Sequence, residues 1–518
     1  MLRIGVDVGG TNTDAVLMDG NRVLADTKSP TTPDVSGGII NAIRTILNTA
    51  DVDPAKVKAV MIGTTHFTNA FVEGKQLLEV GVLRIGLPAG TSIPPMIDWP
   101  THLLHALGGQ CYQVRGGFQY DGRENAALDE DAVRAAAKDM HKKGLKAIAI
   151  SGIFSPVNAQ HEERAAEIVS EEIPQARITL SSRIGRIGML ERENAAIMNA
   201  SLAELASHVV QSFLVALGAL RIDAPFYISQ NDGTLMNAEF VEQYPVLTFA
   251  SGPTNSMRGA AFLSGVKNAL VVDIGGTTTD IGVLVNGFPR ESSLTVDIGG
   301  VRTNFRMPDV FSIGLGGGSL VRNEGGVTVG PDSVGYRLLD EGLVFGGKTL
   351  TASDIAVAAG QVEMGDPSRV SGLDPELVQN AIETIRKTVE DNLDRMKTSA
   401  ESVPLVLVGG GAVLLKGEIA GISEVITPPH AGVANAIGAA IAQVGGETDR
   451  VFLYEDIGRD TAIEQATAEA KAKAISAGGV EDSIEVVNIE ELPLQYVPGG
   501  AVRLKVRVVG DLAFKEDR

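Results

Sequence analysis

One glycine-rich motif occurs twice in this chain of 518 residues, with a constant offset of 266 residues between the copies. The first copy, Asp7 to Asp14, reads DVGGTNTD, and the second copy, Asp273 to Asp280, reads DIGGTTTD. In both copies an apolar run precedes Gly-Gly-Thr, a second apolar run follows it, and an Asp-Gly or Asn-Gly pair leads into a third run. Apolar runs joined by glycine-containing bends predict a three-stranded β-meander in each copy. The repeat therefore implies a duplicated domain.

Alternating helices and strands follow each meander, which is typical of an α/β half-domain. Hydrophobic periodicity and helix boundary signals predict the other elements. Predicted helices span residues 35–47, 130–143, 161–171, 188–218, 352–359, 375–396, 432–444 and 461–477, and predicted strands span 59–63, 147–150, 405–408, 483–489 and 502–509.

These elements predict three parts of the chain. The first half spans residues 1–190 and contains a loop-rich insertion at about 87–124. A connecting helix and the second half span 191–445, and we expect 446–518 to form a small, separate α/β segment. Because long irregular insertions in compact domains often carry function, the insertion is a candidate binding element.

The charge and the cysteine content exclude several classes of protein. The net charge is −20, aromatic residues are 4%, and no run is rich in Lys or Arg, which argues against a nucleic-acid partner. The single cysteine, Cys111, excludes an internal disulfide, a Cys-ligated zinc site and an iron–sulfur cluster held by this chain alone. We interpret Cys111 as a buried residue without a catalytic role.

The apolar segments do not predict a membrane protein. The longest one, residues 197–220, is interrupted by Glu204, His208 and Gln211. The N-terminal residues predict a strand rather than a secretion signal. Together with the single cysteine, these observations favour a cytoplasmic protein with no membrane partner.

The Gly-Gly-Thr turns combine uncovered backbone N–H groups, hydroxyls and carboxylates. Glycine lets the backbone approach phosphate oxygens, threonine hydroxyls donate hydrogen bonds, and an Asp holds Mg²⁺ directly or through water. Two such turns facing each other across a cleft would clamp one polyphosphate. Asp14 and Asp280, which close the turns, fit either a direct role or hydrogen bonding to the local backbone.

The two motifs resemble the phosphate motifs of the actin, Hsp70 and sugar-kinase ATPase superfamily. Val408 to Ala412 resembles its adenosine motif, Arg192 to Ala206 and Ala434 to Ala442 resemble its connecting helices, and the resemblance extends to about residue 445. It implies duplicated actin/Hsp70-like (ribonuclease H-like) α/β ATPase domains around a nucleotide cleft, with the C-terminal segment as an appendage.

Within this superfamily, the chain most resembles the hydantoinase A/5-oxoprolinase family. The family implies ATP-dependent hydrolysis of a cyclic amide such as a hydantoin, 5-oxoproline or a lactam, with ATP and Mg²⁺ as cofactors and a second, B-type subunit. The blocks that carry the resemblance are Gly63-Thr64-Thr65-x-x-Thr68-Asn69-Ala70, Phe154-Ser155-x-x-Asn158-x-x-His161-Glu162, Ser251-Gly252-Pro253 and Ile313-Gly314-x-Gly316-Gly317-Gly318-Ser319.

This resemblance assigns roles to individual residues. Asp7 and Asp273 are expected to be catalytic, as carboxylates that accept a proton or associate with Mg²⁺. The expected phosphate contacts are Gly9, Gly10, Thr11, Thr13, Gly275, Gly276, Thr277 and Thr279, and the expected nucleotide contacts are Gly316, Gly317, Gly318, Gly409, Gly410 and Gly411. Candidate substrate contacts are Thr65, His66 and Asn69. Independently of the resemblance, Arg115 in the glycine-rich insertion is a candidate to bind a substrate carboxylate.

Some of these assignments have alternatives. Gly316 to Gly318 also fit a flexible turn between strands, His66 fits an ordinary hydrogen-bonded histidine, and Arg115 fits a solvated loop. Phe311-Ser312 stands where the family commonly has a His, so a metal or substrate role of that His is in doubt here. The segment after Arg450 is also shorter than we expect for a stand-alone A subunit.

Two other functions remain open for the same fold. One is a small-molecule kinase that phosphorylates a hydroxyl group. The other is a nucleotide-dependent switch or assembly subunit whose ATP cleavage closes the domains on a partner. The fold alone does not choose among them, because function depends on the site. We expect a homo- or hetero-oligomer in each case.

Overall fold

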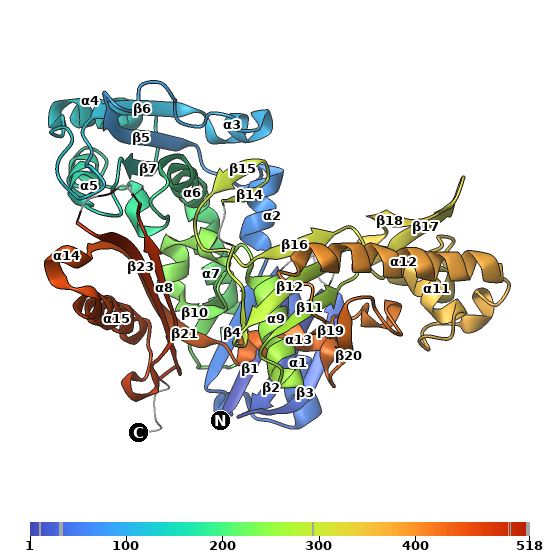
Figure 1. The fold of residues 1–518 in the computed structure, drawn as a ribbon. Helices are drawn as coiled ribbons and strands as arrows, with labels where there is room; N and C mark the ends of the chain where they lie inside the picture. The colour runs from blue at the N-terminus through green and yellow to red at the C-terminus, as the bar shows by residue number, and fades with distance from the viewer. Residues whose placement is uncertain (10–11, 31–34, 293–294, 496, 498, 514–518) are drawn as a thin grey trace.

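The computed structural model describes residues 1–9, 12–30, 35–292, 295–495, 497 and 499–513. Its strands form a nine-stranded sheet, a six-stranded sheet, a four-stranded sheet and two separate hairpins (Figure 1). The first two sheets each contain one of the duplicated meanders, as the repeat predicts.

The nine-stranded sheet contains the first meander and is covered by helices on both faces. Its order is β22-β23-β21-β10-β9-β4-β1-β2-β3. Side chains alternate along a strand: Ala15 and Leu17 pack with α1, whereas Val16 and Met18 pack with α13. The bounds are β1 (Leu2–Val8), β2 (Asn12–Asp19), β3 (Arg22–Pro30), β4 (Ala59–Thr64), β9 (Phe226–Ser229), β10 (Thr234–Asn237), β21 (Gln443–Leu453), β22 (Glu485–Pro493), β23 (Ala501–Gly510), α1 (Val35–Ala50) and α13 (Ala434–Ala440).

The six-stranded sheet contains the second meander and has the same layered plan. Its order is β13-β12-β11-β19-β20, and β16 also pairs with β12. Leu270 and Val272 of β11 pack with α11 and α12, whereas Val271 packs with α9 on the other face. The bounds are β11 (Ala269–Ile274), β12 (Thr279–Val285), β13 (Phe288–Pro289), β16 (Val310–Ile313), β19 (Val403–Val408), β20 (Ile422–Ile426), α9 (Ser251–Ser264), α11 (Ala352–Ala358) and α12 (Pro375–Met396).

The four-stranded parallel sheet, in the order β6-β5-β7-β8, lies at the upper left of Figure 1. The predicted loop-rich insertion therefore contributes a helix, α3, and a strand, β6. Because β6 is an edge strand, Cys111 on it is exposed, so our expectation of a buried cysteine is wrong. The bounds are β5 (Val80–Leu87), β6 (Gln110–Arg115), β7 (Ala147–Gly152), β8 (Arg177–Leu180), α3 (Thr101–Leu107), α4 (Glu130–Lys142) and α5 (Gln160–Glu172).

The predicted helix over 188–218 is two helices, α6 (Met189–Ser201) and α7 (Ala203–Ala219), which are bent by 52° at the break. The backbone N–H of Leu78 donates to the carbonyl of Ser201 at 2.9 Å. In a continuous helix, the carbonyl of Ser201 would accept a hydrogen bond from the next turn of the helix. Here it accepts one from a distant segment of the chain instead. Within the described residues, no single helix is long and apolar enough to cross a membrane. Taken together, α6 and α7 reach the required length and apolar composition, but the pair is bent and largely buried.

The C-terminal strands extend the sheet of the first half and form no sheet of their own. β21 begins at Gln443, pairs in parallel with β10, and is followed by β23 and then β22. β10 would otherwise be the edge of the sheet, and its free N–H and C=O groups favour the addition of a strand. The predicted helix over 432–444 ends at Ala440 for the same reason.

The remaining elements are short or lie at the periphery. The hairpin β14–β15 belongs to the second half in sequence, yet Ile298, Val301 and the nearby Phe305 pack in the core of the first half. The bounds are α2 (His66–Glu73), α8 (Ala238–Gln243), β14 (Val296–Ile298), β15 (Val301–Thr303), β17 (Ser319–Asn323), β18 (Val327–Ser333), α10 (Leu338–Glu341), α14 (Tyr454–Ile457) and α15 (Arg459–Ser476).

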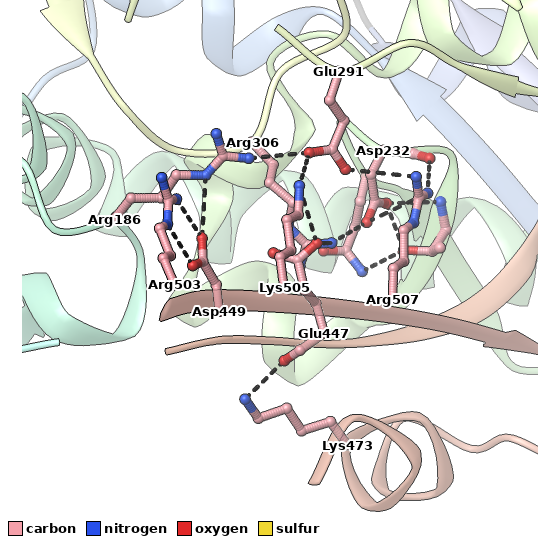
Figure 2. Close-up of polar contacts among 12 residues, drawn as sticks. Arg186, Asp232, Glu291, Arg306, Glu447, Asp449, Lys473, Arg503, Lys505 and Arg507 are labelled. Atoms are coloured by element: carbon pink, nitrogen blue, oxygen red, sulfur yellow. Dashed lines mark hydrogen bonds and ion pairs between the residues drawn. The ribbon is translucent and has the colours of Figure 1, made fainter. Parts of the chain in front are cut away.

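A cluster of charged side chains lies where β21 and β23 meet the second half (Figure 2). Lys505 and Arg507 of β23 pair with Glu291, and Arg306 pairs with Asp232. We call this set the β23 charge cluster; its members are Arg186, Asp232, Glu291, Arg306, Glu447, Asp449, Arg503, Lys505 and Arg507.

Candidate active site

A cavity of about 640 Å³ lies between the two halves, at the ends of β1, β11 and β19. It is lined by segments from both meanders, by the glycines that follow β19 and by the start of α13. The lining residues are Gly9, Asn12, Asp14, Lys28, Thr65, Asn69, Ser256, Asp273, Gly275, Gly276, Thr277, Thr278, Gly317, Gly335, Tyr336, Leu338, Ser353, Met364, Gly409, Gly410, Gly411, Val413, Leu414, Gly432, Ala434 and Asn435.

The two motif copies have equivalent hydrogen bonding around the cavity. Gly9 N donates to the carbonyl of Asn12 at 3.0 Å, and Gly275 N donates to the carbonyl of Thr278 at 2.9 Å. In the hairpin registers, Asp7 lies opposite Asp14 and Asp273 lies opposite Asp280. The duplication seen in sequence is therefore also a duplication of backbone geometry.

A glycine next to each first Asp leaves room for its carboxylate. A Cβ on Gly63 would lie 2.2 Å from Asp7 Oδ1, and a Cβ on Gly409 would lie 2.2 Å from Asp273 Oδ1. Gly409 also has φ +85°, a conformation that favours glycine. The first glycine of the predicted adenosine motif thus accommodates both the turn and the Asp273 side chain.

Asp7 and Asp14 are buried, Asp273 and Asp280 are partly buried, and all four motif carboxylates have a raised pKa. Burial, followed by the charge of Asp14, raises the pKa of Asp7 to about 7, although the hydrogen bond from Asn435 opposes the shift. Burial raises the pKa of Asp280 to about 6 against a hydrogen bond from Ser312. It also raises the pKa values of Asp14 and Asp273. The site therefore favours cations or protons beside these groups.

Lys28 and Asn435 hold the carboxylates of the first half. Lys28 Nζ donates to both oxygens of Asp14 at 2.7 Å, from the cross-strand position on β3. Asn435 Nδ2, from α13, donates to Asp7 Oδ2 at 3.0 Å and to Asp14 Oδ2 at 2.9 Å. Our sequence reasoning missed both residues.

The glycine run at 316–318 supports the second loop. Gly317 N donates to the carbonyl of Gly275 at 3.0 Å, and Gly318 N donates to that of Gly276 at 2.7 Å. A Cβ on Gly316 would lie 2.6 Å from the backbone of Gly276. Gly317 lines the cavity, whereas Gly316 and Gly318 pack behind the loop.

Most of the predicted phosphate and nucleotide residues lie at the cavity, but several do not. Asp7 is buried and is not among the lining residues. Thr13 and Thr279 are buried in their strands, where Thr279 Oγ1 donates to the carbonyl of Leu315 at 2.6 Å. Gly10 and Thr11 lie outside the described residues. The predicted residues that line the cavity are Gly9, Asp273, Gly275, Gly276, Thr277, Gly317, Gly409, Gly410 and Gly411.

The candidate substrate residues are split between the cavity and the surface. Thr65 and Asn69, at the start of α2, line the cavity. His66 is not among the lining residues; its Nδ1 lies 2.7 Å from Thr64 Oγ1, and burial lowers its pKa. Arg115 is exposed at the end of β6, away from the lining residues.

Two of the sequence blocks contact each other beside the cavity. Ser251 Oγ, at the start of α9, lies 3.3 Å from Thr64 N and 3.2 Å from the Thr64 carbonyl. Ser256, one turn later, donates to Asp273 Oδ2 and lines the cavity. α9 therefore connects the first-half wall to the carboxylate of the second half.

Ser312, which stands in place of the family His, donates to Asp280 Oδ1. The hydroxyl thus serves as a hydrogen-bond donor to that carboxylate. Among the described residues, no group of three or more His, Cys, Asp or Glu side chains is arranged to hold a metal ion.

Comparison with known proteins identifies the family. The hydantoinase/oxoprolinase N-terminal region matches residues 3–173, and the hydantoinase/oxoprolinase family matches residues 192–377. The alpha subunit of caprolactamase from Pseudomonas jessenii is 28% identical over 76% of this chain and 59% of its own length. The gamma subunit of acetophenone carboxylase from Aromatoleum aromaticum is 25% identical over 99% of this chain and 81% of its own length.

A solved structure shows the same fold. The ATP-dependent caprolactamase from Pseudomonas jessenii superimposes with a TM-score of 0.77 and 21% identity, over 99% of this chain and 88% of that chain. This agreement and the duplicated meanders confirm the predicted fold class. The chain belongs to the hydantoinase/oxoprolinase family.

Proposed function

We propose that this protein is an ATP-dependent enzyme subunit that activates the carbonyl group of a cyclic amide for ring opening. The observation that carries the proposal is the pair of equivalent glycine turns, each beside two facing Asp residues, around one cavity between the two halves. Backbone N–H groups in such turns can bind phosphate oxygens. Because the two turns come from different halves and face one cavity, they can hold one polyphosphate between them.

The residues present fit MgATP. Carboxylates and phosphates repel each other unless a cation lies between them, and Mg²⁺ prefers such oxygen ligands. Asp273 lines the cavity, and Asp7 Oδ1 is buried without a hydrogen bond among the described residues. We propose that Asp7 and Asp273 hold Mg²⁺, directly or through water, and that Gly9, Gly275, Gly276 and Thr277 contact phosphate.

ATP addresses the chemical difficulty of opening an amide. The amide nitrogen is a poor leaving group and resonance protects the carbonyl carbon, whereas a phosphorylated oxygen makes that carbon electrophilic. The protein then has to align the acceptor and stabilise charge. Lys28 and the glycine turns supply positive charge and N–H donors, and Thr65 and Asn69 supply polar contacts for the acceptor.

The relatives favour a carbonyl acceptor over the hydroxyl acceptor of a kinase. One relative is named for caprolactam, a cyclic amide, and another for acetophenone, a ketone. Ketone activation is therefore the second candidate function. Both relatives are named as subunits, which supports a second subunit here, and the single cysteine fits a cytoplasmic enzyme.

The first experiment measures phosphate release from MgATP with a panel of lactams, hydantoins, ketones and alcohols, using the protein purified with any associated subunit. We expect a lactam to stimulate release, and Asp273→Asn to reduce the stimulated rate by about 100-fold or more. Asp460→Asn, at an exposed carboxylate, is the matched control. Stimulation by alcohols alone would support a kinase, and stimulation by a partner protein alone would support a switch.

A further inference from the structure

The charges around the cavity restrict the substrates that it can accept. Among the described lining residues, Lys28 carries the one positive charge, and Asp14 and Asp273 carry carboxylates. The other lining groups are backbone atoms, hydroxyls, amides and apolar side chains. A bound ATP would add further negative charge to this small volume even with the Mg²⁺ proposed above, because the charge of the triphosphate exceeds that of the cation.

Lys28 is placed to serve the polyphosphate. Its side chain is 34% exposed, whereas that of its partner Asp14 is 3% exposed, so the ammonium group forms the accessible side of the pair. A Cβ on Gly410 would lie 3.7 Å from Lys28 Cε, which places Lys28 against the glycine run that follows β19. The lysine therefore lies between the first-half turn and the glycines of the second half.

The wall contributed by α2 is polar but uncharged. Thr65 precedes the first turn of α2 and makes no side-chain capping hydrogen bond, and Asn69 Nδ2 lies 3.5 Å from Thr65 Oγ1. A hydroxyl and an amide can orient a carbonyl or an N–H group. Arg115, the residue that the sequence offered for a substrate carboxylate, is exposed on β6 and does not line the cavity.

We propose that the site selects an uncharged carbonyl substrate, such as a lactam without an acidic substituent, and discriminates against a substrate that bears a carboxylate. The inference rests on the proposed function and narrows its range of cyclic amides, because 5-oxoproline carries a carboxylate. That group would share the cavity with Asp14, Asp273 and a polyphosphate, while Lys28 and the proposed Mg²⁺ already face these anions. Like charges in a partly dehydrated cavity repel more strongly than in water.

The test compares 5-oxoproline with 5-oxoprolinamide, which has the same ring and an uncharged carboxamide. The measurement is kcat/KM for MgATP hydrolysis stimulated by each compound, with the protein and any associated subunit. We expect the carboxamide to be at least tenfold better. An equal or better value for 5-oxoproline would overturn the inference and leave the proposed function intact, whereas no stimulation by any carbonyl compound would overturn both.

A variant with an added positive charge tests whether the α2 wall is the part of the cavity that discriminates against a carboxylate. Asn69→Lys places a cation on the α2 wall at an exposed position, and we expect it to improve 5-oxoproline relative to the carboxamide by at least tenfold. Asn48→Lys, on the exposed face of α1, adds the same charge at a residue that does not line the cavity and should leave the ratio unchanged. An unchanged ratio in Asn69→Lys, with an unaltered melting temperature, would refute the assignment of this wall.

Discussion

Asn435 is the residue through which α13 contacts two buried carboxylates. Its Nδ2 donates to both Asp7 and Asp14, which otherwise face each other as like charges. Asn435→Asp replaces a donor with a third carboxylate, so we expect the free energy of unfolding at pH 8 to fall by about 1–3 kcal/mol. Urea unfolding followed by circular dichroism measures the change.

Asn69→Asp provides the matched control for Asn435→Asp. It introduces the same charge at an exposed position that lines the cavity but contacts neither buried carboxylate. We expect a change within about 0.5 kcal/mol. Equal destabilisation by both substitutions would show that the added negative charge lowers the stability, and that the loss of the bridging amide of Asn435 does not.

Among the elements, α9 and α13 approach most closely through glycine. A Cβ on Gly438 of α13 would lie 1.8 Å from the carbonyl oxygen of Asn255 in α9, so Gly438→Ala forces one helix to move. We expect the free energy of unfolding to fall by about 1–3 kcal/mol, as measured by urea unfolding. Asn435 of α13 and Ser256 of α9 both line the cavity. A displacement of either helix should therefore also weaken ATP binding, measured by calorimetry.

Gly218→Ala is the control for this helix contact. Gly218 lies in the last turn of α7, and a Cβ there meets no atom within 4 Å. Alanine has the higher helix propensity, so the substitution should leave the stability unchanged or raise it by up to about 1 kcal/mol. A similar loss in both variants would contradict the argument from the α9–α13 contact.

The elements that could be predicted are those specified by local sequence. The meanders follow from apolar runs and glycine bends, and α12 spans Pro375–Met396 as predicted, because Asp374 caps it and Pro375 opens it. The break between α6 and α7 could not be predicted, since it depends on a hydrogen bond from Leu78. Similarly, the addition of β21 to the first sheet depends on a free edge that only the folded chain presents.

The same distinction applies to the site. The glycine turns and the first Asp of each motif could be identified because the motif is repeated. Lys28 and Asn435 belong to no repeated motif, and Asn435 is separated from Asp14 by 421 positions. The predicted hairpin offered one signal for Lys28. Its register places Lys28 of β3 opposite Asp14 of β2, and opposite charges at such positions form a cross-strand ion pair. The roles of all these residues stay predictions until the variants are measured.

At the scale of the whole molecule, the β23 charge cluster connects the C-terminal strands to the segment that carries hairpin β14–β15 (Figure 2). That hairpin packs in the core of the first half, while β16, which follows it, pairs with β12 beside the second glycine turn. Glu291 and Arg306 flank the hairpin on either side in sequence. The cluster therefore fixes both ends of a segment that passes from the second half to the first and back.

This arrangement predicts how stability depends on pH. Burial alone would raise the pKa of Asp232, but the charges of Arg306 and Arg507 outweigh burial and hold its pKa well below the usual range. A lowered pKa means that ionised Asp232 stabilises the folded state above the unfolded-state pKa of about 4, and that this stabilisation is lost as the pH falls through the lower folded-state value. Asp232→Asn should therefore lower the free energy of unfolding by about 3 kcal/mol at pH 7, and by progressively less below pH 4.

Urea unfolding of the wild type and of Asp232→Asn at pH 7, 5 and 3 measures this dependence. Asp460→Asn, at a side chain that is 92% exposed, controls for the loss of one carboxylate and should follow the wild type at every pH. If the difference between Asp232→Asn and the wild type were the same at pH 7 and pH 3, ionisation of Asp232 would not contribute to the cluster. The packing of Ile298, Val301 and Phe305 in the core of the first half, which does not depend on pH, would then hold the segment around the hairpin together with its other contacts, such as the ion pair between Glu291 and Lys505.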